Sequence, residues 1–189
     1  MQSNSELKEF LILACLCCGL LVGAFWLQEN YFSYFDYTPW VNLFSLPAAV
    51  KLIAFIIARG AGFFGVSAGT ALTLHLDSTL NSPALHDYFT SLEFFCLIPF
   101  VGTLLIQKLL KIRSDLVGMT GGQIAWLVVL VTLVNGVSIN AYMLIEGMIA
   151  RHEFGFGVLA TMFGDLTGIA FFLFIVSMAS GFKRSVARD

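Results

Sequence analysis

Long apolar runs separated by short polar stretches dominate the chain. Six of these runs approach the length of a membrane helix, which needs roughly 20 consecutive apolar residues. We therefore expect an all-α bundle of about six transmembrane helices that forms a single domain over residues 1–189. The expected helices cover residues 10–27, 41–58, 60–76, 92–110, 123–149 and 156–182.

The second and third runs meet at a very short join, Ala58-Arg59-Gly60. Because this join leaves almost no loop, a re-entrant pair is the alternative to two full spans. Pro47 falls in the first turns of the second run, where a missing N–H is tolerated. Pro99 is expected to kink the fourth helix.

Glycines at helical spacing mark faces where another helix can approach closely. Such pairs occur in the first, third and sixth runs, as Gly19 and Gly23, Gly65 and Gly69, and Gly164 and Gly168. We expect all of them to be helix-packing positions. The last pair is expected to bring a neighbouring helix against the turn that carries Asp165.

Composition supports a membrane protein. Hydrophobic residues make up 58% of the chain and charged residues only 12%, and the mean hydropathy is +0.87. Soluble domains carry about 25% charged residues, and a soluble fold of this size could not hide so much apolar surface. Helices and short loops fill the chain, so we expect no soluble catalytic or output domain and no nucleic-acid partner.

Basic residues sort to one face of a six-span arrangement. Eight of the ten lie at the chain ends or in alternate loops, namely Lys8, Arg59, Lys108, Lys111, Arg113, Lys183, Arg184 and Arg188. Cytoplasmic loops hold the excess of lysine and arginine. We therefore expect a multi-pass protein of the bacterial inner membrane with both termini in the cytoplasm. The aromatic stretch 28–40 is then expected to lie along the outer surface.

Charged residues inside apolar runs are the first candidates for function, because each costs about 2.5–3.5 kcal/mol on insertion scales. Lys51 lies a few residues into the second helix, and Asp165 lies near the middle of the sixth. They are either a structural ion pair that fixes helix register or part of a polar ligand site or proton-linked site. Glu93 and Glu146 lie near helix ends, where acids can reach water, which favours a structural role.

The fifth helix is more polar than a lipid-facing helix. At roughly 100° per residue, one stripe carries Thr132, Asn135, Ser138, Tyr142 and Glu146. Asn140 points elsewhere. Such groups often bond across helices, which is the packing interpretation. The functional interpretation is a cavity that opens outward, with one ligand site formed by Lys51, Asn135, Tyr142 and Asp165.

The sequence has no phosphate-binding glycine loop, no HExxH pattern and no GxSxG pattern. We therefore expect that the protein is not an enzyme and has no cofactor. Its histidines match no metal-ligand spacing, so we expect no metal site. The cysteines, Cys15, Cys17, Cys18 and Cys96, lie in apolar runs and are expected to be packing residues.

Two segments carry a further pattern. Residues 46–69 read LPAAVKLIAFIIARGAGFFGVSAG, and residues 163–176 read FGDLTGIAFFLFIV. The first resembles the proline-led second element of the MASE1 family, bacterial integral membrane sensory domains, and the second resembles that family's closing helix. The resemblance implies sensing of a small ligand. Members usually have more spans and precede an output domain, so here the resemblance implies a partner protein that receives the signal.

Two other functions stay open. The stretch 28–40 resembles the cap over the outer cavity in substrate-binding subunits of energy-coupling-factor transporters, which are six-helix vitamin-binding proteins with both ends inside. An accessory subunit of a larger membrane complex is the other. We expect a non-enzymatic, MASE1-like sensing or interaction module for a small polar ligand, partnered by a membrane protein or a second copy of itself.

Overall fold

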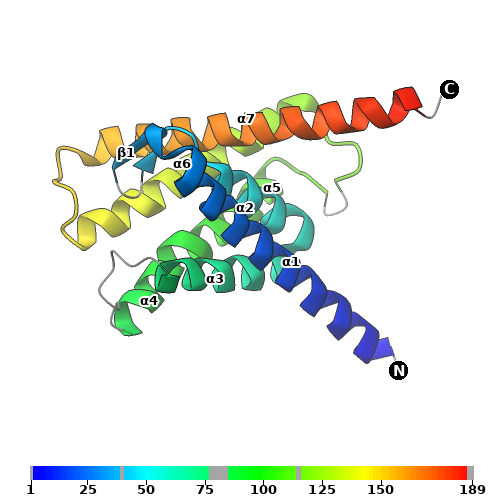
Figure 1. Ribbon diagram of the computed structural model, residues 1–189, viewed down its shortest axis with the longest axis horizontal. Coiled ribbons are helices and arrows are strands. Elements are labelled where there is room, and N and C mark those ends of the chain that lie inside the picture. The colour runs from blue at the N-terminus through cyan, green and yellow to red at the C-terminus, as the bar shows by residue number, and fades with distance from the viewer. Residues whose placement is uncertain (1, 39–40, 77–84, 114–115, 187–189) are drawn as a thin grey trace.

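The structure is a computed structural model that describes residues 2–38, 41–76, 85–113 and 116–186 (Figure 1). As predicted, it is helical. The α-helices are α1 (Gln2–Tyr31), α2 (Leu46–Ile53), α3 (Arg59–Leu76), α4 (Leu85–Leu92), α5 (Ile98–Leu109), α6 (Gly121–Ile145) and α7 (Phe154–Val186). Two π-helical segments, η2 (Ala54–Ala58) and η3 (Glu93–Leu97), join α2 to α3 and α4 to α5. A short turn, η1 (Ser33–Phe35), and a small hairpin of β1 (Asp36–Thr38) and β2 (Val41–Asn42) follow α1.

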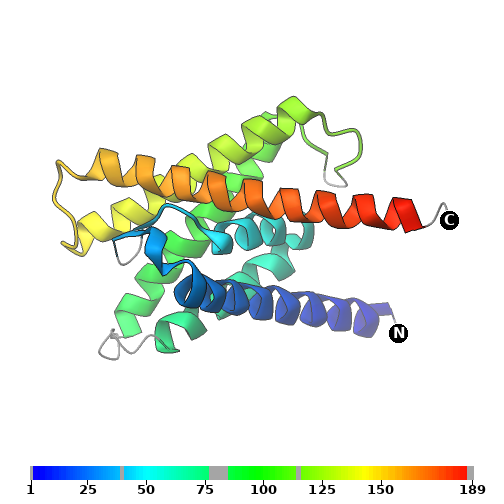
Figure 2. The ribbon, with the colours of Figure 1, turned by 45° about the horizontal axis from the view of Figure 1, so that its top comes forward.

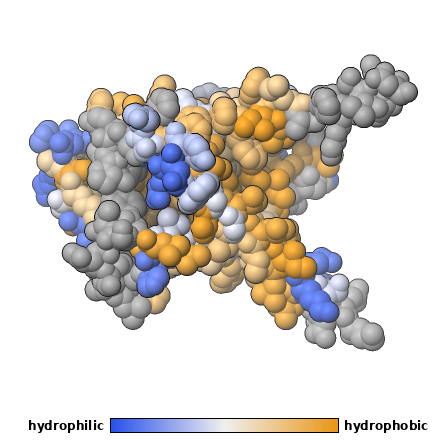
Figure 3. Space-filling view, viewed as in Figure 1, coloured by the Kyte–Doolittle hydropathy of each residue, from blue (hydrophilic) through white to orange (hydrophobic). Residues whose placement is uncertain are grey.

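The helices are those of a multi-pass membrane protein. Within the described residues, five stretches are long and apolar enough to cross a membrane, namely Ser5–Tyr31, Leu46–Leu76, Phe89–Leu109, Gly121–Ile145 and Phe154–Met178. Much of the visible face is hydrophobic, and its polar groups form a patch left of the centre as well as patches at the left end and near the lower right tip (Figure 3). The expected count of six spans is not confirmed, because residues 46–76 form a single candidate stretch.

That stretch, residues 46–76, is not one straight helix. Arg59 has a φ of 47°, and a Cβ at Gly62 would collide with the carbonyl of Ala54. In a straight helix those two positions would lie about 12 Å apart, so the chain folds back at Arg59 (Figure 2). Together α2 and η2 cover 13 residues. This is about 20 Å of helix, too short for a hydrocarbon core of about 30 Å. The helical part of the second run is therefore a half-helix rather than a full span.

Several helix boundaries differ from those expected. The second helix begins at Leu46 rather than near residue 41, because Pro47 lies in its first turn and residues 43–45 are not helical. The fourth helix begins at Leu85, inside the stretch that was expected to be a loop. The fifth expected helix, which is α6 in the structure, ends at Ile145 rather than at residue 149, close to Gly147, which has a φ of 70°.

The bundle has two distinct ends. The helix α1 packs against α3, α6 packs against α5 and α7, and α2 contacts both α1 and α7. The start of α1, the end of α7, the turn from η2 to α3 and the connection from α5 to α6 lie toward one end (Figures 1 and 2). The end of α1 and the turn from α6 to α7 lie toward the other.

The glycine pairs of α1 and α3 behave differently. A Cβ at Gly65 would collide with the carbonyl of Ala14, and a Cβ at Gly69 would lie 3.1 Å from the carbonyl oxygen of Cys18, so α3 lies directly against α1. An added Cβ at Gly19 or Gly23 would meet nothing within 4 Å. The packing role expected for Gly19 and Gly23 is therefore not seen among the described residues, since no neighbour approaches them closely.

Candidate functional site

The short non-helical segment before α2 passes between α1 and α7; we call residues 41–45 the strap. The Ser45 N–H donates to the carbonyl of Gly164 at 2.9 Å, and Thr167 Oγ1 donates to the carbonyl of Leu43 at 2.9 Å. On the α1 side, the Leu46 N–H donates to Gln28 Oε1 at 3.2 Å. These bonds fix where α2 begins.

Two glycines of α7 make room for the strap. A Cβ at Gly164 would collide with the carbonyl of Asn42, and a Cβ at Gly168 would collide with the carbonyl of Ser45. The sequence predicted a helix against these glycines, but the structure places the strap there. Gly164 lies ten residues after the start of α7 at Phe154. That distance is about 15 Å along the helix, near half the hydrocarbon thickness, so α2 begins inside the membrane.

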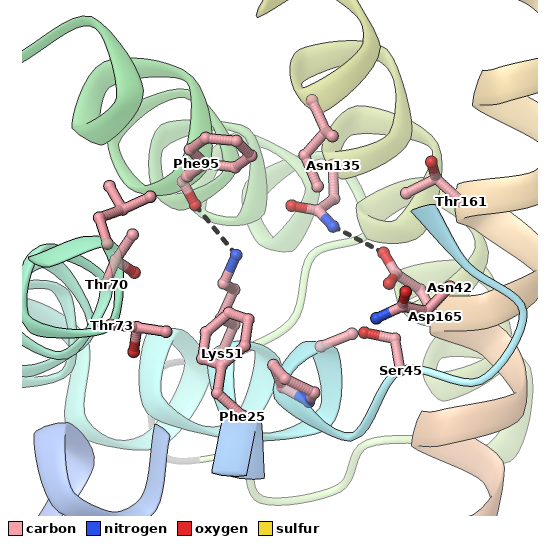
Figure 4. A pocket seen from close by; sticks show the side chains of 14 residues that line it. Phe25, Asn42, Ser45, Lys51, Thr70, Thr73, Phe95, Asn135, Thr161 and Asp165 are labelled. Atoms are coloured by element: carbon pink, nitrogen blue, oxygen red, sulfur yellow. Dashed lines mark hydrogen bonds between the residues drawn. The ribbon is translucent and has the colours of Figure 1, made fainter. Parts of the chain in front are cut away.

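The beginning of α2 borders a cavity of about 80 Å³ among α1, α2, α3, η3, α6 and α7 (Figure 4). Its polar lining residues are Asn42, Ser45, Lys51, Thr70, Thr73, Asn135, Thr161 and Asp165. Its other walls are formed by Phe25, Pro47, Ala48, Leu74, Phe95 and Ile139. A mostly apolar pocket with a few convergent polar groups is the usual form of a small-molecule site.

Asp165 and Asn135 form one wall of the cavity. Asn135 Nδ2 donates to Asp165 Oδ2 at 2.6 Å, and the side chain of Ser45 also lies against the carboxylate. Asn135 is 7% exposed, and its Oδ1 has no hydrogen-bond partner. This oxygen points into the cavity (Figure 4). An unsatisfied buried acceptor costs about 1–3 kcal/mol, so Oδ1 is suited to receive a donor from a bound molecule.

Lys51 lies on a different wall. It is 8% exposed, and its Nζ donates to the carbonyl of Phe95 at 3.4 Å and lies 5.7 Å from the centre of the Phe95 ring. Among the described residues it forms no ion pair with Asp165, which the sequence left open, and the cavity lies between the two side chains (Figure 4).

The carbonyl that receives Lys51 comes from an irregular part of a helix. The Ile98 N–H bonds to Glu93 in the wider π pattern of η3. Pro99 has no N–H to offer the carbonyl of Phe95 four residues earlier. The carbonyls of Phe94 and Phe95 instead accept side-chain bonds from Ser138 Oγ and Lys51 Nζ. The irregularity expected at Pro99 thus provides an acceptor for the buried lysine.

Tyr142 does not line the cavity. Its hydroxyl oxygen accepts a hydrogen bond from Ser91 Oγ at 3.0 Å, and its ring centre lies 5.1 Å from that of Phe95. It lies seven residues beyond Asn135 on α6, which is about 10 Å along the helix. Of the four residues that the sequence suggested as one site, Lys51, Asn135 and Asp165 border the same cavity, whereas Tyr142 lies beside Phe95.

The sequence interpretation missed several lining residues. Ser45 could have been found, because it precedes a proline-led helix start. Thr70 and Thr73 could have been suspected from their position beside the glycine face of α3. Asn42 carries no such signal, since its place depends on where the strap enters the bundle.

Other candidate chemistry lies outside the cavity. Glu93 and Glu146 are exposed. All four cysteines are free thiols. Within the part of the chain that the structure describes, no three His, Cys, Asp or Glu residues are grouped to hold a metal ion.

Comparison of the chain with protein families, curated proteins and solved structures finds no match.

Proposed function

We propose that this chain is a bacterial inner-membrane receptor that binds a small polar molecule in the cavity bordered by α2, α6 and α7. The observation that carries the proposal is the separation of Lys51 and Asp165 across a cavity into which Asn135 Oδ1 points without a partner. A purely structural pair gains most when the two charges meet directly, because desolvation is costly in a low-dielectric interior. Charges held apart around a cavity favour a ligand between them.

The lining is suited to binding rather than to catalysis. Threonine and serine hydroxyls, two amides and two opposite charges can orient a ligand by hydrogen bonds and electrostatic attraction. The described lining residues include neither a histidine nor a cysteine that would pair as base and nucleophile. A non-enzymatic role is therefore the one that we propose.

The proposed orientation places both termini in the cytoplasm. It is supported by the basic residues Lys8, Arg59, Lys111 and Arg113, which belong to segments at the end of the bundle that holds the termini (Figure 2). The residues of η1 and β1, which precede the strap, then face the periplasm. A ligand reaches the cavity from that side, along the strap.

The resemblance to MASE1 domains favours a sensory role. The ligand would contact α2, α6 and α7 together, so its binding would change the free energy with which the half-helix α2 is held against α7. A membrane-protein partner, or a second copy of the chain, would then read the position of these helices. This proposal explains how a cavity in the outer half of the bundle could act on a cytoplasmic reader.

A transporter subunit is the second candidate. It is favoured by Asn42 and Ser45, which follow the first outer loop and line the cavity, as a capping loop would. In that case cells that express the chain with its coupling partners accumulate the ligand, and Asp165→Asn lowers the uptake. A sensor leaves uptake unchanged.

The binding proposal is tested by comparing two neighbouring positions on α3. Thr73 lines the cavity, whereas Leu72 is 43% exposed on the outside of the bundle. Thr73→Cys should react with the membrane-impermeant reagent 2-sulfonatoethyl methanethiosulfonate at least tenfold faster than Leu72→Cys, because only the cavity position meets water. The native chain, with its four free cysteines, supplies the blank rate.

Equal, slow labelling of Thr73→Cys and Leu72→Cys would overturn the proposal, because the cavity would then be closed to polar molecules. If either variant fails to fold, Thr161→Cys and Leu159→Cys repeat the comparison on α7. Thr161 lines the cavity, and Leu159 is 64% exposed.

A further inference from the structure

We propose that the ligand of this cavity is a small zwitterion, which carries one carboxylate and one ammonium group as a short amino acid does. The inference rests on the proposed function, because it names the ligand class of the same site. It follows from the chemistry of the two opposite walls, from the net charge of the site and from its size.

The wall formed by α2 and α3 is suited to an anion. Lys51 Nζ has three protons, and its described hydrogen bond is one of 3.4 Å to a neutral carbonyl. The hydroxyl of Thr70 accepts a hydrogen bond from Cys96 Sγ at 3.4 Å, so its own proton is left to donate. Both side chains border the cavity (Figure 4). A carboxylate placed here would receive a charge-assisted bond from the lysine.

The wall formed by α6 and α7 is suited to a cation with N–H donors. The Asp165 carboxylate is 3% exposed and accepts a bond from Asn135 Nδ2. Asn135 Oδ1 can only accept, and it is the buried atom without a partner that points into the cavity. An ammonium group can donate to both Asn135 Oδ1 and Asp165. A second carboxylate at this wall would add repulsion and leave Oδ1 unsatisfied.

Charge balance excludes a singly charged ligand. Lys51 and Asp165 together carry no net charge when both are ionised. A lone anion or a lone cation would add an uncompensated charge inside the membrane, where it is strongly disfavoured. A zwitterion keeps the site neutral and places each of its charges beside an opposite one.

The dimensions favour a short, partly aliphatic molecule. The cavity of about 80 Å³ is small beside the roughly 300–1,000 Å³ of drug-sized pockets. It is walled by Phe25, Leu74 and Ile139 as well as by polar groups. A second cavity of about 20 Å³ adjoins Lys51 and Asp165 and is bordered by Leu52, Phe55 and Val131. That space suits a small apolar side group.

The test uses protection of Thr73→Cys from the sulfonate reagent in a non-ionic detergent. Glycine, L-alanine, β-alanine and 4-aminobutyrate supply zwitterions with different charge separations. Propionate, propylammonium and propionamide are matched probes that each lack one or both charges. At least one zwitterion should slow labelling at a concentration tenfold or more below that needed by any single-charge probe.

Neutralising the charge on one wall should improve protection by the single-charge probe that matches the charge left on the other wall. Asp165→Asn removes the negative wall, so propionate should protect this variant at least tenfold better than the native site. Lys51→Met should show the same gain for propylammonium. A merely structural role for either residue would not produce these reciprocal gains. If a variant does not fold, the other variant alone carries the test.

The head group of phosphatidylethanolamine is also a zwitterion, with a phosphodiester in place of the carboxylate beside its ammonium group. Nanodiscs of phosphatidylglycerol alone are therefore compared with nanodiscs that also contain phosphatidylethanolamine. Slower labelling only in the second kind would assign the zwitterion to a lipid head group; protection by the amino acids in both would assign it to a soluble ligand. If Thr73→Cys labels rapidly but no zwitterion protects it, this inference falls and the binding proposal stands. If Thr73→Cys does not label, the binding proposal itself falls.

Discussion

Two polar contacts join α6 to α7 about one turn apart, and they differ in what surrounds them. Asn140 Nδ2 donates to Thr161 Oγ1 at 3.0 Å and to the carbonyl of Gly136 at 2.8 Å, and Asn140 is fully buried. Its oxygen lies so close to Gly157 that a Cβ there would collide with it. Neither side-chain oxygen has a hydrogen-bond partner among the described residues. Asn135, however, bonds to an ionisable carboxylate and turns its oxygen toward the cavity instead of against the neighbouring helix. The same residue type therefore joins helices at one level and lines a candidate site at the other.

The difference depends on the strap. At the level of Asn140, the small residue Gly157 lets α6 and α7 close on each other. At the level of Asn135, Gly164 and Gly168 admit the strap beside α7, so α2 begins there and brings Lys51 toward the cavity. Polar residues in a membrane helix thus acquire different roles according to whether a helix or a non-helical segment lies beside them.

The largest expected effect comes from filling the space that the strap occupies. Gly168→Ala should destabilise the fold by about 2–3 kcal/mol or more, because its Cβ would meet the Ser45 carbonyl and overpacking is costly. Gly23→Ala is the matched control, since its Cβ would meet nothing within 4 Å. Unfolding in mixed micelles measures both. Equal stability of the two variants would mean that the strap does not lie against α7.

A smaller effect separates the two asparagines. Asn140→Ala should lower the free energy of unfolding by about 1–2 kcal/mol, since it removes a buried hydrogen bond between helices. It should leave labelling of Thr73→Cys and its protection by zwitterions unchanged. Asn135→Ala should abolish that protection. Loss of protection in the Asn140 variant, with protection kept in the Asn135 variant, would reverse the two roles.

Tyr142→Phe should have a still smaller effect. It removes the oxygen that accepts from the buried Ser91, which is a loss of about 0.5–1.5 kcal/mol for a neutral hydrogen bond. Because Tyr142 lies outside the cavity, ligand protection of Thr73→Cys should stay the same. If the ligand concentration that half-protects Thr73→Cys changes more than threefold, Tyr142 belongs to the site after all.

The membrane helices and the two charged candidate residues could be predicted from the sequence for a physical reason. Apolar runs of this length are stable only in lipid, and Lys51 and Asp165 stand out because a charge inside such a run is expensive. Asn135 could also be predicted as a candidate site residue, because it lies on a polar stripe of the helix that the structure shows as α6. These features are local, so one sequence is enough to show them.

The remaining features depend on tertiary contacts that periodicity does not report. Tyr142 shares the stripe of Asn135, but a stripe fixes direction around a helix and not depth along it. Gly164 and Gly168 indicate close approach without saying that the strap is the partner. The pattern also could not distinguish a full second span from a half-helix, because the lipid-like composition of residues 46–58 is the same in both.

The most direct measurement is the water accessibility of the cavity in the protein without added ligand. The account predicts that the sulfonate reagent labels Thr73→Cys at least tenfold faster than Leu72→Cys, because only Thr73 borders the polar cavity between Lys51 and Asp165. Equal, slow labelling at both positions would contradict the assignment of the cavity as a ligand site.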